Sequence, residues 1–178
     1  MKATGIVRRI DDLGRIVIPK EIRRTLRIRE GDPLEIFTER DGSVVFKKYS
    51  PVGEWSEPAG ILCESIFKTT GFSVAVTDRD ACIAVSGAPR RELCERRISS
   101  ELESVMDSRN HYLRGEDDPA IPLADGENKY FAESVSPIIS EGDVLGSVVF
   151  FSRGDKRAGE TESKLAQAAA LFLGRQLE

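Results

Sequence analysis

The sequence predicts an α+β protein built from two domains. β-branched runs separated by turn residues fill the first fifty residues, whereas later strands alternate with segments of helical spacing. Charge divides at the same place, because residues 1–50 hold 12 Lys and Arg against 8 Asp and Glu, and the rest of the chain holds 14 against 22. We therefore expect a first domain of residues 1–50, called the head, a linker of residues 51–55, and a second domain of residues 56–178.

Turn chemistry and apolar runs predict a β-β-α-β-β order in the head. Asp-Asp-Leu-Gly at residues 11–14 joins the first two strands as a hairpin or a loop-linked crossing, and Asp41-Gly42 joins the last two as a hairpin. Pro19 suits the first turn of a helix over residues 20–26, on which Ile22 and Leu26 form a buried stripe. The expected strands are residues 5–10, 15–18, 34–39 and 44–48. A domain this short buries little surface alone, so we expect it to complete its core with a second copy.

The sequence of the second domain predicts an α-β-β-α-β-β-α order. Helical spacing of apolar residues indicates a helix that ends at Gly71 and a last helix over residues 160–177. Because the turns between successive strands are too short for parallel crossovers, we expect an antiparallel sheet covered by helices. The apolar faces are Ala59, Leu62, Cys63 and Ile66 on the first helix, and Leu165, Ala169, Phe172, Leu173 and Leu177 on the last. The remaining elements are strands at residues 72–77, 81–86, 130–139 and 144–152, a helix within residues 89–105, and a long loop at residues 110–128.

Arginines in the head indicate a surface that binds phosphates. Arg8, Arg15, Arg23 and Arg24 are the leading candidates, since each guanidinium offers five donors in a rigid fork. A second group could add phosphate contacts: Lys2, Arg9, Lys20 and Arg27. Arg23, Arg24 and Arg27 could instead complement the carbonyl end of the helix, although that alternative leaves Arg8 and Arg15 without an explanation.

Four sequence blocks of the head carry a family resemblance. Thr4 to Arg8, Asp12 to Pro19, Glu21 to Leu26, and Leu34 to Ile36 resemble the DNA-binding domain of AbrB-family transition-state regulators. The resemblance implies an intertwined homodimer, a swapped-hairpin β-barrel whose arginines at the four leading positions contact double-stranded DNA. No recognition helix is predicted, so base specificity is not assigned, and readout of DNA shape is our hypothesis.

Residues 136–150 and the order of elements around them resemble a GAF domain, and related sensor folds such as PAS share the pattern. GAF domains commonly enclose a small ligand, here of unknown identity, and seven apolar residues could line such a site or form an ordinary core: Phe72, Val74, Val76, Ile83, Phe131, Val148 and Phe150. Asn128-Lys129 is similar to the start of the cyclic-nucleotide motif, but the downstream Asp-Glu pair is missing, which argues against cyclic nucleotides. The last helix packs within its domain or against another copy, and the second arrangement would give a tetramer.

Both domains together resemble regulators of late sporulation genes, which implies a transcription regulator that activates and represses. An enzyme is disfavoured, because no nucleophile elbow, phosphate-binding loop or HExxH motif is present. We expect no catalytic residue, no cofactor, and no metal at the sole His111. Cys63, Cys82 and Cys94 lack metal spacing and indicate buried or reduced thiols.

Absence of a signal peptide or apolar span predicts a cytoplasmic, nucleoid-associated bacterial protein without a membrane partner. Three alternatives stay open. The chain could be an antitoxin, in which a disordered acidic tail follows the head. It could be a nucleoid-associated protein whose second domain serves oligomerisation only. It could also be a ligand-binding module whose DNA contact is incidental.

Overall fold

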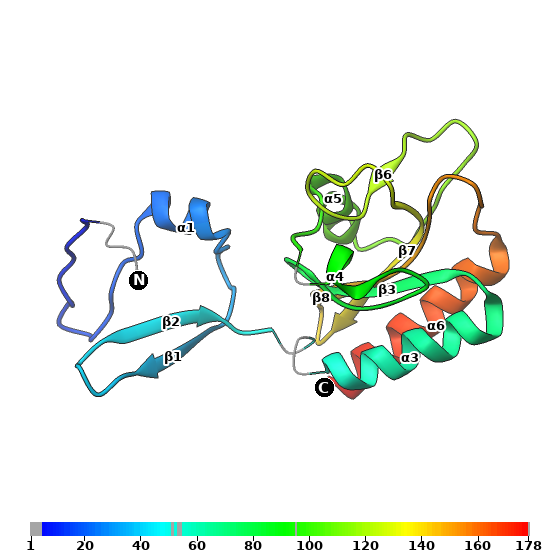
Figure 1. Ribbon diagram of the computed structural model, residues 1–178. Helices are drawn as coiled ribbons and strands as arrows, with labels where there is room; N and C mark the ends of the chain where they lie inside the picture. The colour runs from blue at the N-terminus through cyan, green and yellow to red at the C-terminus, as the bar shows by residue number, and fades with distance from the viewer. Residues whose placement is uncertain (1–4, 51, 53–54, 95, 178) are drawn as a thin grey trace. The chain divides into compact units, whose positions relative to one another are not determined.

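The chain folds into two compact units, Met1–Tyr49 and Ser50–Glu178 (Figure 1). The computed structural model describes residues 5–50, 52, 55–94 and 96–177. Val52, in the expected linker, is 1% exposed and belongs to the core of the second domain. Residues 51, 53 and 54 of that linker lie outside the described residues.

The head contains one helix and one hairpin. Helix α1 spans Lys20–Leu26, and the antiparallel strands β1, Leu34–Thr38, and β2, Val44–Lys48, form the hairpin that the sequence predicts. In the connecting turn, an Asp41 side-chain oxygen accepts a hydrogen bond from the Ser43 N–H at 2.8 Å, and Gly42 has a φ of 87°. Asp41 therefore stabilises the turn as a side-chain acceptor, and Gly42 suits it because glycine tolerates a positive φ.

The first expected strand pair is absent from the described part of the head. Residues 5–10 and 15–18 form no ladder within this chain, and only the turn at residues 11–14 is closed, by hydrogen bonds between Asp11 and Arg15 and between Gly14 and Asp11. A strand needs a partner for its N–H and C=O groups, and the described residues of one chain place none beside either segment. Val7 is 89% exposed and Val17 71% exposed, so their apolar side chains also lack a second layer.

Helix α1 buries no residue, which corrects the expected buried stripe. Ile22 is half-buried, and Leu26 is 52% exposed. The spacing is helical as predicted, but a stripe becomes buried only when another surface packs on it. Within one chain, the head does not supply that surface.

The second domain is built on one antiparallel sheet in the order β4-β3-β8-β7-β5, with β6 paired to β7. The strands are β3 Ser73–Asp78, β4 Cys82–Ser86, β5 Tyr112–Leu113, β6 Ile121–Pro122, β7 Phe131–Ser140 and β8 Asp143–Ser152. The four longer strands confirm the sequence prediction. The short β5 and β6 lie in the region expected to be a loop.

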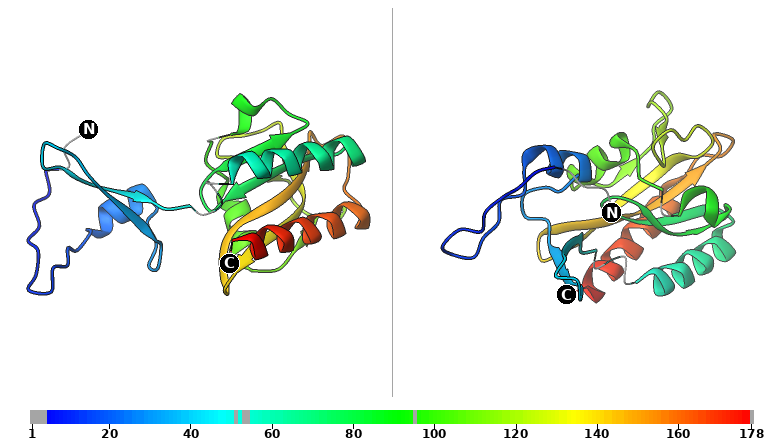
Figure 2. Two further views of the ribbon diagram at one scale, coloured as in Figure 1. Left: turned by 90° about the horizontal axis from the view of Figure 1, so that it is seen from below. Right: turned by 60° about the vertical axis from the view of Figure 1, so that its left-hand side comes forward.

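Helices cover both faces of this sheet. Helices α3, Ser56–Thr70, and α6, Glu160–Gln176, lie side by side on one face, as Figure 2 shows. Side chains alternate along the strands, so Val74 and Val76 of β3 pack with these helices while Ala75 packs with the other face. The other face carries α4, Arg90–Leu93, and α5, Ser100–Asp107. Because both faces are covered, almost every residue of β7 and β8 is buried, including the polar ones.

The single helix expected within residues 89–105 is two helices. Ser99 begins the second one, because its hydroxyl oxygen accepts the Leu102 N–H at 3.0 Å. Between the helices, Arg97 and Ile98 form isolated bridges to Ala81 and Ala124. These tertiary bridges override a helical composition.

Helix α6 uses a face that differs in part from the expected one. Ala169 and Leu173 are buried as predicted, but Phe172 is 53% exposed. Leu165 and Leu177 pack at the margin of the core, and the face is completed by small residues, including Ala166 and Gly174. Among the described residues, no helix is both long enough and apolar enough to cross a membrane.

Gly174 lets α6 approach β7 closely, and this contact yields a stability prediction. A Cβ at Gly174 would overlap the backbone carbonyl of Ile139, so Gly174→Ala should destabilise the second domain by about 1–3 kcal/mol. Gly60→Ala in α3 is the matched control, because its Cβ would lie 3.9 Å from Arg90 and should stabilise by about 0.5–1 kcal/mol. Urea unfolding followed by circular dichroism measures both. Equal effects of the two substitutions would contradict this account.

Candidate nucleic-acid interface

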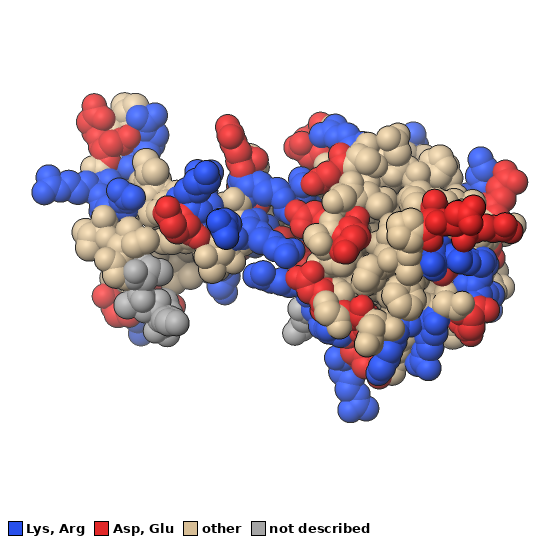
Figure 3. Space-filling model, turned by 90° about the horizontal axis from the view of Figure 1, so that it is seen from above, with Lys and Arg blue, Asp and Glu red and all other residues tan. Residues whose placement is uncertain are grey.

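Basic side chains gather on the head, on an otherwise acidic chain. Figure 3 shows lysine and arginine side chains across the face of the head that it presents, with acidic side chains among them, and both signs also on the second domain. Arg8, Arg9, Arg15, Arg23 and Arg24 are all exposed. Exposed guanidinium groups on a small domain create a positive field that attracts polyanions.

Arg15 is held at the end of the first turn by Asp11. One carboxylate oxygen of Asp11 accepts the backbone N–H groups of Leu13 at 3.0 Å and Arg15 at 2.8 Å, and the other accepts the Arg15 Nε–H at 2.8 Å. The Arg15 backbone N–H and then its guanidinium hold the pKa of the Asp11 carboxyl below its ordinary value of 3.8. Sequence reasoning assigned Asp11 only to a turn, although an Asp four residues before an Arg, with a Gly between, was an available signal.

The arginines of α1 serve the helix as well as the surface. Arg23 and Arg24 occupy its last turn, where cations interact favourably with the carbonyl end, so the structure is compatible with the alternative structural role for this pair. Arg27 ends the helix with a left-handed φ of 51°, and its carbonyl accepts the Lys48 Nζ at 3.0 Å. Arg27 is half-buried and has a structural role at the C-cap.

The predicted site residues come from three segments. Arg8 and Arg9 lie on the extended segment before the first turn, Arg15 follows that turn, and Arg23 and Arg24 share one turn of α1. Lys20 is exposed at the start of the same helix. Lys2 lies outside the described residues. Such a set can donate to phosphate oxygens from several directions, which suits a nucleic-acid backbone.

The seven residues proposed to line a ligand site mostly fill the core. Five of them pack against α3 and α6 as buried core residues: Phe72, Val74, Val76, Val148 and Phe150. Ile83 lies partly buried against the same cluster, and Phe131 is half-buried. Phe72 also lines a cavity of about 190 Å³, together with Tyr130 and Lys156. The alternative that these residues form an ordinary core therefore describes five of the seven.

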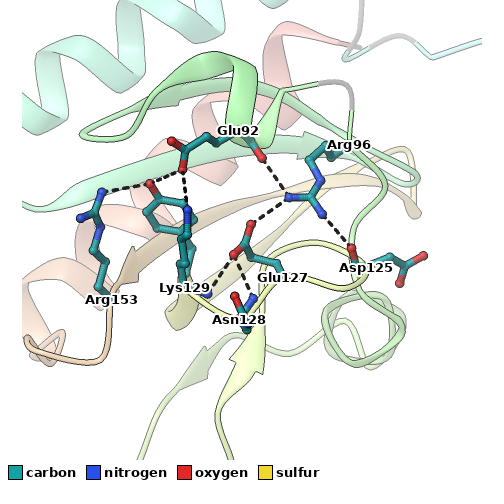
Figure 4. A network of polar contacts seen from close by, with 8 residues as sticks. Glu92, Arg96, Asp125, Glu127, Asn128, Lys129 and Arg153 are labelled. Carbon is teal, nitrogen blue, oxygen red and sulfur yellow. Dashed lines mark hydrogen bonds and ion pairs between the residues drawn. The ribbon is translucent and has the colours of Figure 1, made fainter.

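A polar network fastens the loop that contains Asn128-Lys129, as Figure 4 shows. Glu127 accepts the N–H groups of Asn128 and Lys129 at 2.9 and 2.8 Å, and it pairs with Arg96 at 2.9 Å. Arg96 also donates to the backbone carbonyls of Glu92 and Asp125. These partners fix the loop to α4 and to the segment that follows it.

The same network anchors the buried Tyr130 at the start of β7. Its hydroxyl donates to Glu92 at 2.9 Å and accepts from Arg153 at 3.1 Å, while the Arg153 guanidinium stacks 5.3 Å from the ring centre. Lys129 lies 3.9 Å from the same Glu92 carboxylate. The Asn128 backbone and both the backbone and the side chain of Lys129 therefore have partners within the fold.

Glu133 is a buried carboxylate that sequence reasoning missed. It is 0% exposed and accepts from Ser152 at 3.0 Å, from Arg114 at 3.1 Å and from Arg157 at 3.3 Å. Two cations and a hydroxyl satisfy a charge that would otherwise be costly to bury. A glutamate within the apolar run of β7 was the available signal.

The cysteines are free thiols. Cys63 and Cys82 are buried and Cys94 is half-buried. Burial raises the pKa of Cys63 to about 12, and a hydrogen bond with Cys94, together with burial, raises the pKa of Cys82. Protonated thiols are poor nucleophiles and poor metal ligands. Across the described ranges, no group of three or more His, Cys, Asp or Glu could hold a metal ion.

The family models that match this chain meet at residue 54, close to the point where its charge balance changes from basic to acidic. Residues 54–178 match the family model described as stage V sporulation protein T C-terminal, transcription factor. Residues 7–54 match the model described as antidote-toxin recognition MazE, bacterial antitoxin. The two models together cover both units of the structure.

Relatives of known name extend these matches. Stage V sporulation protein T of Bacillus subtilis is 51% identical over 100% of this chain and 99% of its own length. The transition state regulatory protein AbrB of the same organism is 59% identical over 29% of this chain and 52% of its own. A GAF domain from a phosphoenolpyruvate-protein phosphotransferase of Coxiella burnetii is 16% identical, with a TM-score of 0.54 over 68% of this chain and 81% of that domain.

The fold is therefore an AbrB-like head followed by a GAF-like domain, as the sequence predicts. The GAF likeness concerns the fold alone, whereas the likeness to the sporulation regulator runs through both domains. From these two matches, one to the whole chain and one to its larger part, we conclude that the chain belongs to the stage V sporulation protein T family of transcription factors.

Proposed function

We propose that this protein is a homo-oligomeric regulator that binds double-stranded DNA through its head and both activates and represses late sporulation genes. The observation that carries the proposal is the exposed arginine set of the head: Arg8, Arg15, Arg23 and Arg24. Neutralisation of DNA phosphates by arginine and lysine supplies a large part of the affinity of DNA-binding proteins. The likeness to AbrB over the head supports the same function.

Dimerisation through the head is the second part of the proposal. Six apolar side chains of the first two segments and the turn between them are exposed in one chain: Ile6, Val7, Ile10, Leu13, Ile16 and Val17. An exposed apolar patch of this size is typical of an interaction site. A second copy could cover it, because its own first two segments also lack strand partners. A swapped-hairpin dimer would pair residues 5–10 and 15–18 and present each arginine twice. The proposed dimer therefore doubles the charge that faces DNA.

Tetramer formation through the second domain is the third part. Ile61 on α3 is 62% exposed, and Leu171 and Phe172 on α6 are 59% and 53% exposed. These helices lie side by side on the same face of the sheet. An apolar surface across two helices suits an intersubunit helix bundle.

A signal at the second domain would then alter DNA binding by the heads. An open groove of about 600 Å³ runs between the start of α3 and β4, lined by residues such as Ser56, Glu64 and Arg90. The groove is one place where a small molecule or a protein signal could bind. The alternative is that the second domain serves oligomerisation only, as in a nucleoid-associated protein. A ligand that saturates this domain without changing DNA affinity or geometry would favour that alternative.

The proposed function requires no catalytic residue, cofactor or metal, in keeping with a family of transcription factors. Its DNA partner would place the protein in the bacterial cytoplasm, with the nucleoid. The alternative of a ligand-binding module with incidental DNA contact can be tested by measuring duplex binding by the isolated head. Salt-dependent duplex binding retained by the head alone would exclude that reading.

The antitoxin reading rests on the family model that matches residues 7–54. An antitoxin of this type would carry a disordered tail after the head, whereas here residues 56–177 form a sheet covered on both faces. Limited proteolysis should leave a stable fragment that starts near Val52, because Val52 is buried in the second core. Complete digestion beyond the head, read by mass spectrometry, would favour the antitoxin.

Salt dependence tests the arginine surface. If about 4 to 8 phosphates are neutralised per dimer, log K should fall with log salt at a slope of roughly −4 to −7. Arg15→Gln should make this slope shallower by roughly 1 to 2, since two copies are lost per dimer. Arg40→Gln is the matched control, because Arg40 lies in the exposed turn between β1 and β2. Fluorescence anisotropy with a duplex measures both. Equal slopes in all three proteins would contradict the assignment.

Light scattering tests the helix-bundle surface. Replacing Leu171 and Phe172 together with Glu should convert a tetramer to a dimer, because four charges would enter each apolar contact between two copies. Leu113→Glu on β5, where Leu113 is 39% exposed, is the control for a new surface charge elsewhere. A tetramer mass retained by the α6 variant would place the contact on another surface.

A further inference from the structure

Asp11 joins the backbone and the side chain of Arg15 in one closed unit. Its carboxylate accepts from the Arg15 N–H and from the Arg15 Nε–H, both at 2.8 Å. The Asp11 N–H in turn donates to the Arg15 carbonyl at 3.0 Å, and the Gly14 N–H donates to the Asp11 carbonyl at 3.0 Å. Gly14 has a φ of 74°, which completes the turn. Arg15 is thus held at its backbone and at the base of its guanidinium.

The donors of Arg15 are divided between the protein and the solvent. Asp11 uses only the Nε–H, so both Nη groups keep their four N–H donors of the five that a guanidinium carries. The Arg15 side chain remains 69% exposed, and within the described residues its Nη atoms have no hydrogen-bond partner. The free edge of the guanidinium is the pair of Nη groups, which suits a bidentate contact to a phosphate or a guanine.

The contact contributes little to folding. Exposed ion pairs typically contribute about 0–1 kcal/mol, and the side chains here are 69% and 37% exposed. Its larger effect is on conformational freedom, because an unanchored arginine must be ordered when it binds a partner. Fixing that side chain in advance removes the cost from the binding step.

We propose that Asp11 is a positioning residue for DNA binding, which holds the Arg15 guanidinium with its Nη edge directed to the nucleic acid. This inference rests on the proposed DNA-binding function. The proposal predicts that neutralising Asp11 weakens DNA binding, which is the opposite of what electrostatics alone predicts. A carboxylate beside a polyanion repels it, so charge alone predicts that neutralising Asp11 tightens binding.

Asp12 provides a matched control in the same turn. It is exposed like Asp11, and within the described residues it makes no hydrogen bond or ion pair. Asp11→Asn and Asp12→Asn therefore remove the same charge from adjacent positions. In Asp11→Asn, the amide oxygen can still accept the Leu13 and Arg15 backbone N–H groups, but the amide nitrogen cannot accept from the Arg15 Nε–H. The substitution thus removes the anchor and keeps the turn.

The experiment measures duplex affinity of the full-length protein at fixed salt by fluorescence anisotropy. Asp11→Asn should weaken binding by about 5- to 100-fold, because two side chains per dimer must then be ordered on binding. Asp12→Asn should bind as the wild type does, or more tightly. In an Arg15→Ala background, Asp11→Asn should change affinity by less than about twofold, since the side chain it positions is gone.

Four outcomes would overturn the inference. Equal tightening by Asp11→Asn and Asp12→Asn would mean that only charge matters. Weakening that persists in the Arg15→Ala background would mean a general role in the fold of the head. Should Asp11→Asn fail to fold, ¹⁵N relaxation of the Arg15 Nε–H group in the wild type tests the anchor directly, and mobility equal to that of Arg40 would exclude it. Equal binding by wild type and Arg15→Ala would instead overturn the proposed DNA contact of Arg15, and the positioning role with it.

Discussion

A domain of about fifty residues can bury only part of its apolar surface by itself, and this limit governs the head. Among the described residues of one chain, its first two segments have no strand partner, α1 has no buried residue, and Val7 and Val17 lie largely in solvent. The second domain meets the opposite condition, since its sheet is covered on both faces and its core closes within the chain. The division of the protein into two units follows from this difference in burial.

The incomplete head connects folding to the proposed function. If two heads complete one another, the same event that covers the apolar side chains doubles the arginines that face DNA. Asp11 adds a second level of order, because it fixes one of those arginines at an exposed turn. Affinity would then depend on the number of charges and also on how little freedom they lose when DNA binds.

The second domain shows that likeness to a sensor fold does not by itself create a ligand site. Residues expected to line a cavity, such as Val74 and Phe150, fill the layer between the sheet and helices α3 and α6. Its polar groups are largely satisfied by one another, as the Glu133 and Tyr130 networks illustrate. Surfaces that remain for interaction include the outer side of α3 and α6 and the groove beside the start of α3.

The sequence by itself determined the two-domain order, the Asp41-Gly42 hairpin, the four long strands of the second domain and the arginine candidates, because these follow from local turn chemistry, apolar periodicity and charge. Only the tertiary structure decided which apolar side chains are covered. Phe172 faces solvent and Glu133 is buried, since burial depends on the neighbouring layer and not on residue type. The break between α4 and α5 and the missing pairing of residues 5–10 and 15–18 have the same origin. Each depends on a partner strand that is distant in sequence or absent from the single chain, and no local pattern can specify such a partner.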